Sequence, residues 1–146
     1  MRTRRTEPTD KRGTVEVVSK KLTTHGPAEM FTGDVWFDVI ARGEGESRVR
    51  VNLVRFTPGA RTAWHSHSLG QTLHVTDGLG VVVTREQVIA LRPGVTVYTP
   101  PGEEHWHGAL PGHLMAHLAI WEDDDADWKQ HVTDEEYAAA TAVADA

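Results

Sequence analysis

Short segments of alternating apolar and polar residues, separated by glycine and proline turns, constrain the fold of this chain most strongly. Residues 48–56 place valine and leucine on one face of an extended segment and arginine and asparagine on the other. This is the two-residue period of a β-strand. Similar segments follow, with turn signals such as Arg92–Gly94 between them, at 71–76, 81–91, 95–100 and 113–121. Short strands at this spacing predict an all-β sandwich or barrel.

The two ends of the chain depart from this pattern. Thr14–Ser19 alternates enough to predict a first short strand, whereas the residues before it are polar and lack periodicity. Near the other end, Thr133 precedes three acids, which predicts a capped helix through Tyr137–Ala142. We therefore predict a flexible N-terminal arm at 1–13, a single β-barrel domain at 14–122, and an acidic turn with a short C-terminal helix at 123–146.

Composition narrows the classes of function. A chain of 146 residues has the usual size of one domain. The absence of cysteine excludes disulfides and thiolate ligands, and leaves histidine, carboxylate and amide groups for metal binding. No apolar run approaches the roughly 20 residues of a membrane span, and the N-terminus lacks the apolar core of a signal peptide. We therefore expect a cytoplasmic protein with no membrane partner.

Charge is distributed unevenly along the chain. The net charge of -6 argues against a nucleic-acid partner, because proteins that bind the phosphate backbone usually present a basic face. Residues 1–21 hold seven Lys or Arg against three acids, and residues 122–146 hold nine acids against one Lys. We interpret these ends as a solvated arm and a solvated tail.

The segment Gly59–Gly78 contains the side chains best suited to a metal ion. His65 and His67 are two residues apart, so a strand would direct both imidazoles to one face. Gln71 begins the next predicted strand, and His105 is the best candidate for a third imidazole. Nitrogen and oxygen ligands without sulfur suit a divalent transition metal, namely manganese, iron, nickel, copper or zinc. We predict that His65, His67, Gln71 and His105 bind this ion.

A longer spacing pattern is more specific than the His-x-His pair alone. In its first part, five residues separate Gly59 from His65, one separates His65 from His67, three separate His67 from Gln71, and six separate Gln71 from Gly78. Fifteen residues then precede Gly94. In the second part, five residues separate Gly94 from Pro100, one separates Pro100 from Gly102, and two separate Gly102 from His105. This pattern resembles the two sequence motifs of the cupin superfamily, which implies a double-stranded β-helix, or jelly-roll barrel.

Two positions depart from those motifs. Gln71 stands where most cupins have glutamate, so four neutral ligands would leave a divalent ion with its full charge of +2. Ala109 stands where the second motif commonly ends in asparagine, which we expect to change only a turn.

His117 and His107 are the candidates for proton transfer. His117 shares one face of the segment 113–121 with Met115 and Trp121. If that face points into the barrel, the imidazole would lie near the metal as a free acid or base; otherwise His117 is a core residue. His107 is in phase with His105, so we expect it beside the ligands.

The remaining histidines and most aromatic residues receive structural interpretations. His74 is out of phase with Gln71, so we expect it to face outward, at a subunit contact. We assign the other histidines to the surface or to loops; they are His25, His113 and His131. We assign the large aromatic residues to the core or to an interface; they are Trp36, Phe37, Trp64 and Trp106.

A narrower resemblance covers about residues 26–137. The segments GPAEMFTG, MAHLAI and DWKQHVTDEEY, together with the two motifs, resemble the small bacterial cupins that include manganese-dependent hydroxynitrile lyases and are often labelled carboxymuconolactone decarboxylase-like. This resemblance implies manganese as the metal, His65, His67, Gln71 and His105 as its ligands, and His117 as the acid or base.

Three functions are compatible with these residues. In a lyase, the metal binds a hydroxyl or carbonyl oxygen of a small substrate while His117 moves a proton and a C–C bond breaks or forms. The alternatives are an oxygenase that uses the same three-histidine and glutamine centre, and a non-catalytic cupin that binds a small molecule. We favour the hydroxynitrile lyase-like reaction. We also expect a homodimer paired through exposed edge strands, or a higher homo-oligomer.

Overall fold

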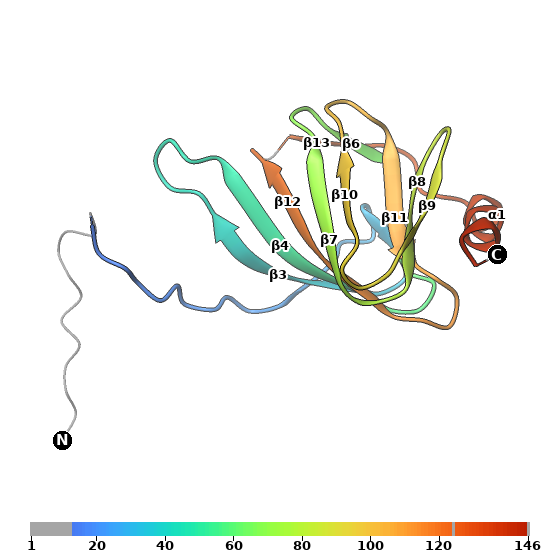
Figure 1. Cartoon of the computed structure of the whole chain (residues 1–146), viewed down its shortest axis with the longest axis horizontal. Coiled ribbons are helices and arrows are strands. Elements are labelled where there is room, and N and C mark those ends of the chain that lie inside the picture. The colour runs from blue at the N-terminus through green and yellow to red at the C-terminus, as the bar shows by residue number, and fades with distance from the viewer. Residues whose placement is uncertain (1–12, 124, 146) are drawn as a thin grey trace, which may run out of the picture.

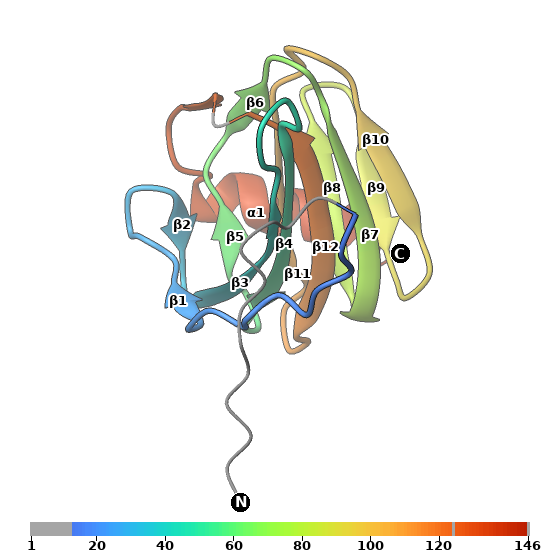
Figure 2. The same ribbon diagram turned by 90° about the vertical axis from the view of Figure 1, so that its left-hand side faces the viewer.

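The computed structural model describes residues 13–123 and 125–145, and it confirms the all-β fold with a C-terminal helix. Two antiparallel sheets curl around a common interior (Figures 1 and 2). The first sheet has the order β1 (Thr24–His25), β3 (Val35–Arg42), β4 (Val49–Phe56), β12 (Met115–Glu122), β7 (Gln71–Gly78) and β10 (Thr96–Thr99). The second has the order β13 (Ala126–Trp128), β6 (His65–His67), β11 (His105–Ala109), β5 (Arg61–Thr62) and β2 (Phe31–Thr32), and β8 (Gly80–Thr84) joins β11 to β9 (Val88–Leu91).

The alternation of the long strands builds the core between the sheets. Strand β7 buries Leu73 and Val75, which are 0% and 1% exposed, and β12 buries Met115 and Ala119 in the same cluster. Burying each large apolar side chain stabilises the fold by about 1.5–3 kcal/mol. The other members of this cluster are Val35, Val54, Phe56, Ala60, Val82, Leu91 and Ala109.

Two glycines allow strands to approach closely. Gly78 has a φ of +75°, and a Cβ there would lie 1.8 Å from the carbonyl oxygen of Leu114. A Cβ on Gly108 would lie 2.6 Å from the carbonyl oxygen of Ala60, so a side chain would push β5 away from β11. Glycine is therefore required where these strands meet.

The C-terminal helix α1 (Asp134–Ala144) begins as the sequence predicts. The Thr133 side chain accepts a hydrogen bond from the Glu136 amide, and the Glu136 carboxylate accepts one from the Thr133 amide. This reciprocal cap satisfies two amides that have no partner within the helix. The helix packs outside β8 and β9, on the far side of the barrel from the N-terminal segment (Figure 1). Its apolar cluster contains Trp64, Val81, Val83, Trp106, Leu110, Val132, Tyr137 and Ala140.

Arg61 fastens the start of α1 to the barrel. Its Nη2 donates hydrogen bonds to the Val132 carbonyl at 2.9 Å and to the Asp134 carboxylate at 2.8 Å. The guanidinium lies 4.5 Å from the centroid of the Tyr137 ring, and the Tyr137 hydroxyl donates to the Ala109 carbonyl at 2.6 Å. The helix is thus linked to β5 and β11 by polar contacts as well as by its apolar face.

Several local predictions were wrong. Thr14–Ser19 forms no strand, because no neighbouring strand pairs with its backbone in the described structure. Ala109 lies in the buried strand β11 and not in a turn. The segment predicted as an acidic turn contains β13, which pairs with β6. The predicted flexible arm, residues 1–13, lies outside the described residues apart from Gly13.

The helix described here is not long and apolar enough to cross a membrane.

We predict that Arg61→Ala destabilises the protein by about 2 kcal/mol, because it leaves the buried Val132 carbonyl without its charged donor. Thermal or denaturant unfolding followed by circular dichroism measures this change. The matched control is Arg92→Ala, which alters an exposed turn and should leave the free energy of unfolding nearly unchanged. Equal stability of the two variants would contradict the role of Arg61.

Candidate metal centre

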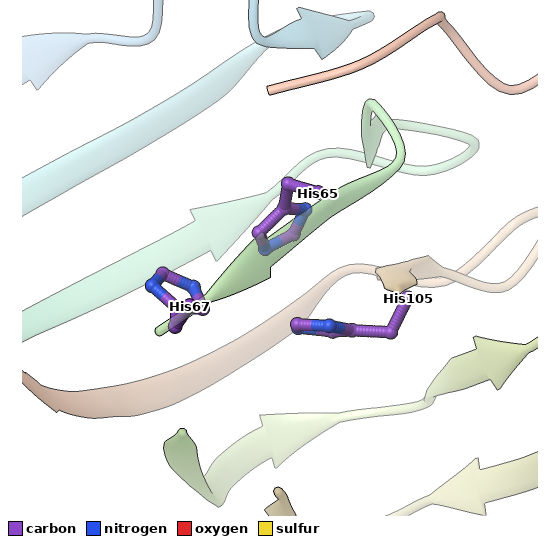
Figure 3. Close-up of side chains that lie close together, drawn as sticks. All are labelled: His65, His67 and His105. Carbon is purple, nitrogen blue, oxygen red and sulfur yellow. The ribbon is translucent and has the colours of Figure 1, made fainter. Parts of the chain in front are cut away.

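Three imidazoles from two neighbouring strands lie around one space. His65 and His67 extend from the same face of β6, and β11 pairs with β6 so that His105 lies opposite His65. One ring nitrogen from each residue lies within 4.8 Å of the others. Figure 3 shows the three side chains close together. All three side chains are buried. The structure therefore brings together three predicted ligands that are separated by up to forty residues in the sequence.

Hydrogen bonds fix the orientation of two of these rings. Nδ1 of His65 donates to the Ala63 carbonyl at 2.9 Å, and Nδ1 of His105 donates to the Glu103 carbonyl at 3.0 Å. In a neutral ring this leaves Nε2 as a lone pair. Neither ring nitrogen of the buried His67 has a hydrogen-bond partner among the described residues. Fixing one ring nitrogen so that the other can bind a cation is the usual arrangement of metal-binding histidines.

Burial keeps the three imidazoles neutral. It lowers the pKa of His65 well below the usual value, and the neighbouring His105 lowers it further. Burial is also the main reason that the pKa of His67 is lowered to about 4 and that the pKa of His105 is lowered. A neutral imidazole is the form that coordinates metal, so no proton has to leave these rings near neutral pH.

Gln71 completes the predicted set. Its Oε1 lies 3.2 Å from Nε2 of His105. With Nδ1 of His105 bonded to a carbonyl, Nε2 of His105 and Oε1 of Gln71 both carry lone pairs that a cation between them could bind. Burial lowers the pKa of His105, so a second proton on this ring is disfavoured. The donor set therefore fits a metal cation, with three imidazole nitrogens and one amide oxygen as the groups that could hold it.

The cluster opens into an apolar cavity of about 500 Å³. His65, His67, Gln71 and His107 contribute the polar side of its wall, while aromatic and aliphatic side chains form most of the remainder. An apolar cavity with a few convergent polar groups is the usual form of a small-molecule site. The other lining residues are Met30, Phe31, Phe37, Asn52, Val54, Thr62, Ala119, Trp121, Ala126 and Trp128.

Trp128 is a site residue that the sequence did not reveal. It lies on β13 opposite His65, and its ring stacks on that imidazole with centroids 4.4 Å apart and an interplanar angle of 25°. The Phe31 ring lies beside it in the cavity wall, and the centroids of the Phe31 and Trp128 rings are 6.1 Å apart. The only signal was an aromatic residue in an otherwise acidic segment. Its position depends on the pairing of a strand too short to show a period.

His107 and His117 form a buried pair beside the cluster. Nδ1 of His107 and Nε2 of His117 share a hydrogen bond of 2.9 Å, and the other nitrogen of each ring has no partner among the described residues. His107 lines the cavity, whereas His117 lies behind it and packs against Phe56 with centroids 5.3 Å apart. Burial lowers the pKa of His117 to about 4. His117 thus reaches the cavity through His107.

The remaining histidines lie away from this cluster. His74 faces outward from β7, between the buried Leu73 and Val75, and its Nδ1 shares a hydrogen bond of 2.8 Å with the Thr96 hydroxyl. His25 bonds to Asp34 at 3.0 Å, and His113 and His131 are exposed.

The aromatic residues divide between three environments. Trp64 and Trp106 lie in the core beneath α1. Phe37 lines the cavity, whereas Trp36 is 43% exposed and packs against His25.

Comparison with known proteins agrees with this architecture. The sequence profile of the family described as "Cupin domain" matches residues 52–121. The chain is 45% identical over 127 residues to the (R)-mandelonitrile lyase of Granulicella tundricola. This alignment covers 84% of this chain and 97% of that protein. The chain belongs to the cupin family. This cupin is also similar to a solved cupin-like protein from Thermotoga maritima, with 38% identity, a TM-score of 0.78, and coverage of 87% of this chain and 98% of that one.

More distant likenesses show the fold alone. The polyketide cyclase RemF from Streptomyces resistomycificus has a TM-score of 0.65 with this cupin and 17% identity, over 85% of this chain and 91% of that one. Function must therefore be argued from the site and not from the barrel.

We predict that His65→Ala, His67→Ala and His105→Ala each lose most of the bound divalent metal, because each variant removes one of four protein donors. Gln71→Ala should have a milder effect, since water can replace a neutral amide oxygen. Elemental analysis of the purified proteins measures the metal content, and His74→Ala is the matched control. A histidine variant that keeps stoichiometric metal would remove that residue from the ligand set.

Proposed function

We propose that this cupin is a metal-dependent lyase that cleaves or forms a C–C bond in a small cyanohydrin-type substrate, with the cytoplasm as its compartment. The observation that carries the proposal is the three-histidine group, two of whose members, His65 and His67, line an apolar cavity. It occurs in a chain that matches almost the whole length of a protein named as a mandelonitrile lyase.

The resident cofactor in this proposal is a divalent transition metal, with manganese as the first choice. His65, His67, Gln71 and His105 would hold it. When bound, the ion supplies Lewis-acid polarisation of a substrate hydroxyl or carbonyl oxygen. Because all four protein donors are neutral, they do not reduce the positive charge available to that oxygen.

The cavity wall selects and orients the organic part of the substrate. Phe31, Phe37 and Trp128 present aromatic surface, and aliphatic residues line much of the remainder. Against this wall, away from the four donors, a charged group would lose its hydration without gaining a partner, whereas an aryl or alkyl group gains contact area. We infer that the substrate is neutral and carries an aryl or alkyl group.

His107 is the residue best placed to exchange a proton with this substrate. It lines the cavity, and its Nε2 has no partner among the described residues. His117 holds the opposite nitrogen of the same ring, so it fixes the direction in which Nε2 points. We therefore propose His107 as the acid or base that contacts the substrate, and His117 as the residue that acts through it.

A cyanohydrin cleavage assay tests the proposed reaction. Protein purified without added metal is first submitted to elemental analysis and then assayed with mandelonitrile, with and without dioxygen. We expect release of cyanide and aldehyde without oxygen consumption, loss of this activity after chelation, and recovery with Mn²⁺. Substrate-dependent oxygen uptake would instead support an oxygenase. Ligand binding that survives chelation, without turnover, would support a binding protein.

We predict that His107→Ala and His117→Ala each lower turnover per bound metal by about 10²–10⁴-fold, because each removes part of one proton-transfer unit. The double variant should be about as slow as His107→Ala, since residues that act as a unit are not additive. Metal content and melting temperature are measured on the same preparations, and His74→Ala is the control. Full activity per metal in His117→Ala would exclude it from the mechanism.

A further inference from the structure

A row of paired residues crosses three strands of the second sheet at the candidate metal centre. His65 of β6 pairs with His105 of β11, and His105 also pairs with Thr84 of β8. In the described structure, β6 and β11 pair at this one position, whereas β11 and β8 pair at five. Backbone pairing therefore holds β11 on β8 more extensively than on β6. The separation of His65 from His105 depends on further contacts.

Side chains next to this row form a cluster, here called the Arg85 clamp, which contains Arg85, Trp64, Glu104 and Glu136. Arg85 directly follows β8, and its guanidinium carbon lies 3.6 Å from the centroid of the Trp64 ring. Its Nη2 donates a hydrogen bond to the Glu104 carboxylate. Trp64 directly precedes His65 in the sequence, and Glu104 directly precedes His105. One guanidinium thus contacts the neighbours of two predicted metal ligands.

Glu136 of α1 completes the clamp. Its Oε2 accepts a hydrogen bond of 3.2 Å from Nε1 of Trp64 and lies 3.9 Å from Nη1 of Arg85. The planar guanidinium of arginine can stack on an aromatic ring and donate to carboxylates from its edge at the same time, whereas lysine has no such planar group. The indole of Trp64 is therefore held at its face by a cation and at its Nε1 edge by a carboxylate.

The exposure of the charged groups limits what the clamp contributes to folding. The side chains of Arg85, Glu104 and Glu136 are 49%, 26% and 36% exposed, and ion pairs at the surface stabilise a fold only slightly. Trp64, in contrast, is 3% exposed. A shift of its ring would move the backbone that carries the His65 imidazole. The clamp is thus better suited to fix a position than to stabilise the barrel.

We propose that Arg85 is a positioning residue, which sets the separation of His65 from His105 and so raises the affinity of the centre for a divalent metal. The proposal rests on the metal centre and not on the lyase reaction. Arg85 forms no hydrogen bond with either imidazole in the described structure, so it acts through Trp64 and Glu104. Charge alone would have the opposite effect, because a cation repels a metal ion. The direction of the change therefore separates position from charge.

The test compares the dissociation constant for Mn²⁺ of the natural chain with that of Arg85→Met, at a temperature at which both are folded. Methionine keeps an unbranched apolar chain beside the indole but removes the guanidinium. We expect Mn²⁺ to bind about tenfold more weakly, as when groups that orient metal ligands are removed, and the melting temperature to change by less than about 4 °C. The matched control, Arg92→Met, removes an exposed cation from another turn and should bind Mn²⁺ as the natural chain does.

Unchanged or tighter binding of Mn²⁺ by Arg85→Met would overturn the proposal. A natural chain that binds no Mn²⁺ would overturn the metal centre and this proposal with it. Normal binding without cyanohydrin cleavage would count against the lyase alone and would leave the role of Arg85 standing.

Two further measurements distinguish positioning from a general loss of structure. Electron paramagnetic resonance of the Mn²⁺-loaded protein reports the geometry of the ligands, and the zero-field splitting should change in Arg85→Met but not in Arg92→Met. Glu104→Gln removes a charged acceptor of the same guanidinium and should also weaken binding. The losses in Arg85→Met and Glu104→Gln should not add in the double variant, because both break one clamp. Identical spectra, or fully additive losses, would overturn the proposal.

Discussion

The antiparallel pairing of β11 with β6 is the contact on which the candidate metal site depends, because it places His105 opposite His65. Strand β6 has only three residues, so its position is set by β11 on one side and β13 on the other. Strand β11 is in turn held by five paired positions with β8. Its Trp106 side chain points away from the cavity into the cluster beneath α1. The helix thus supports the ligands although it lies outside the barrel.

The sequence predicted the elements whose residues follow a regular or local pattern. The long strands follow from the alternation of their residues, and the helix cap follows from the local hydrogen bonds of its residues. The shared face of His65 and His67 follows from the two-residue period of a strand. His105 was the best candidate for a third imidazole, but no local rule spans the separation from His65, so the specific support for it came from the resemblance to the cupin motifs. Trp128 was missed because β13 is formed by its pairing with β6 and is too short to show a period. The strand predicted at Thr14–Ser19 was wrong because alternation without a partner strand does not form a sheet.

Burial of five histidines in one region limits the charge that the site can carry. His65, His67, His105, His107 and His117 are all buried, and the charge of one protonated ring would disfavour protonation of the next. The rings therefore remain neutral and present lone pairs to a cation. An amide at Gln71 adds an oxygen without adding a negative charge. In the proposed lyase, the positive charge of a bound cation would be balanced from the cavity side, and this would favour a substrate oxygen that gains negative charge during the reaction.

The hydrogen bond between His107 and His117 contains one proton, and either ring can donate it. If His117 donates, the neutral His107 has its own proton on Nε2 and can donate a hydrogen bond to a ligand in the cavity. If His107 donates from Nδ1, its Nε2 is a lone pair and can accept a proton. Both arrangements leave the pair uncharged, so burial penalises neither. A buried pair of neutral imidazoles can therefore present a hydrogen-bond donor or a proton acceptor to the same cavity, which a single buried imidazole with a fixed partner could not do.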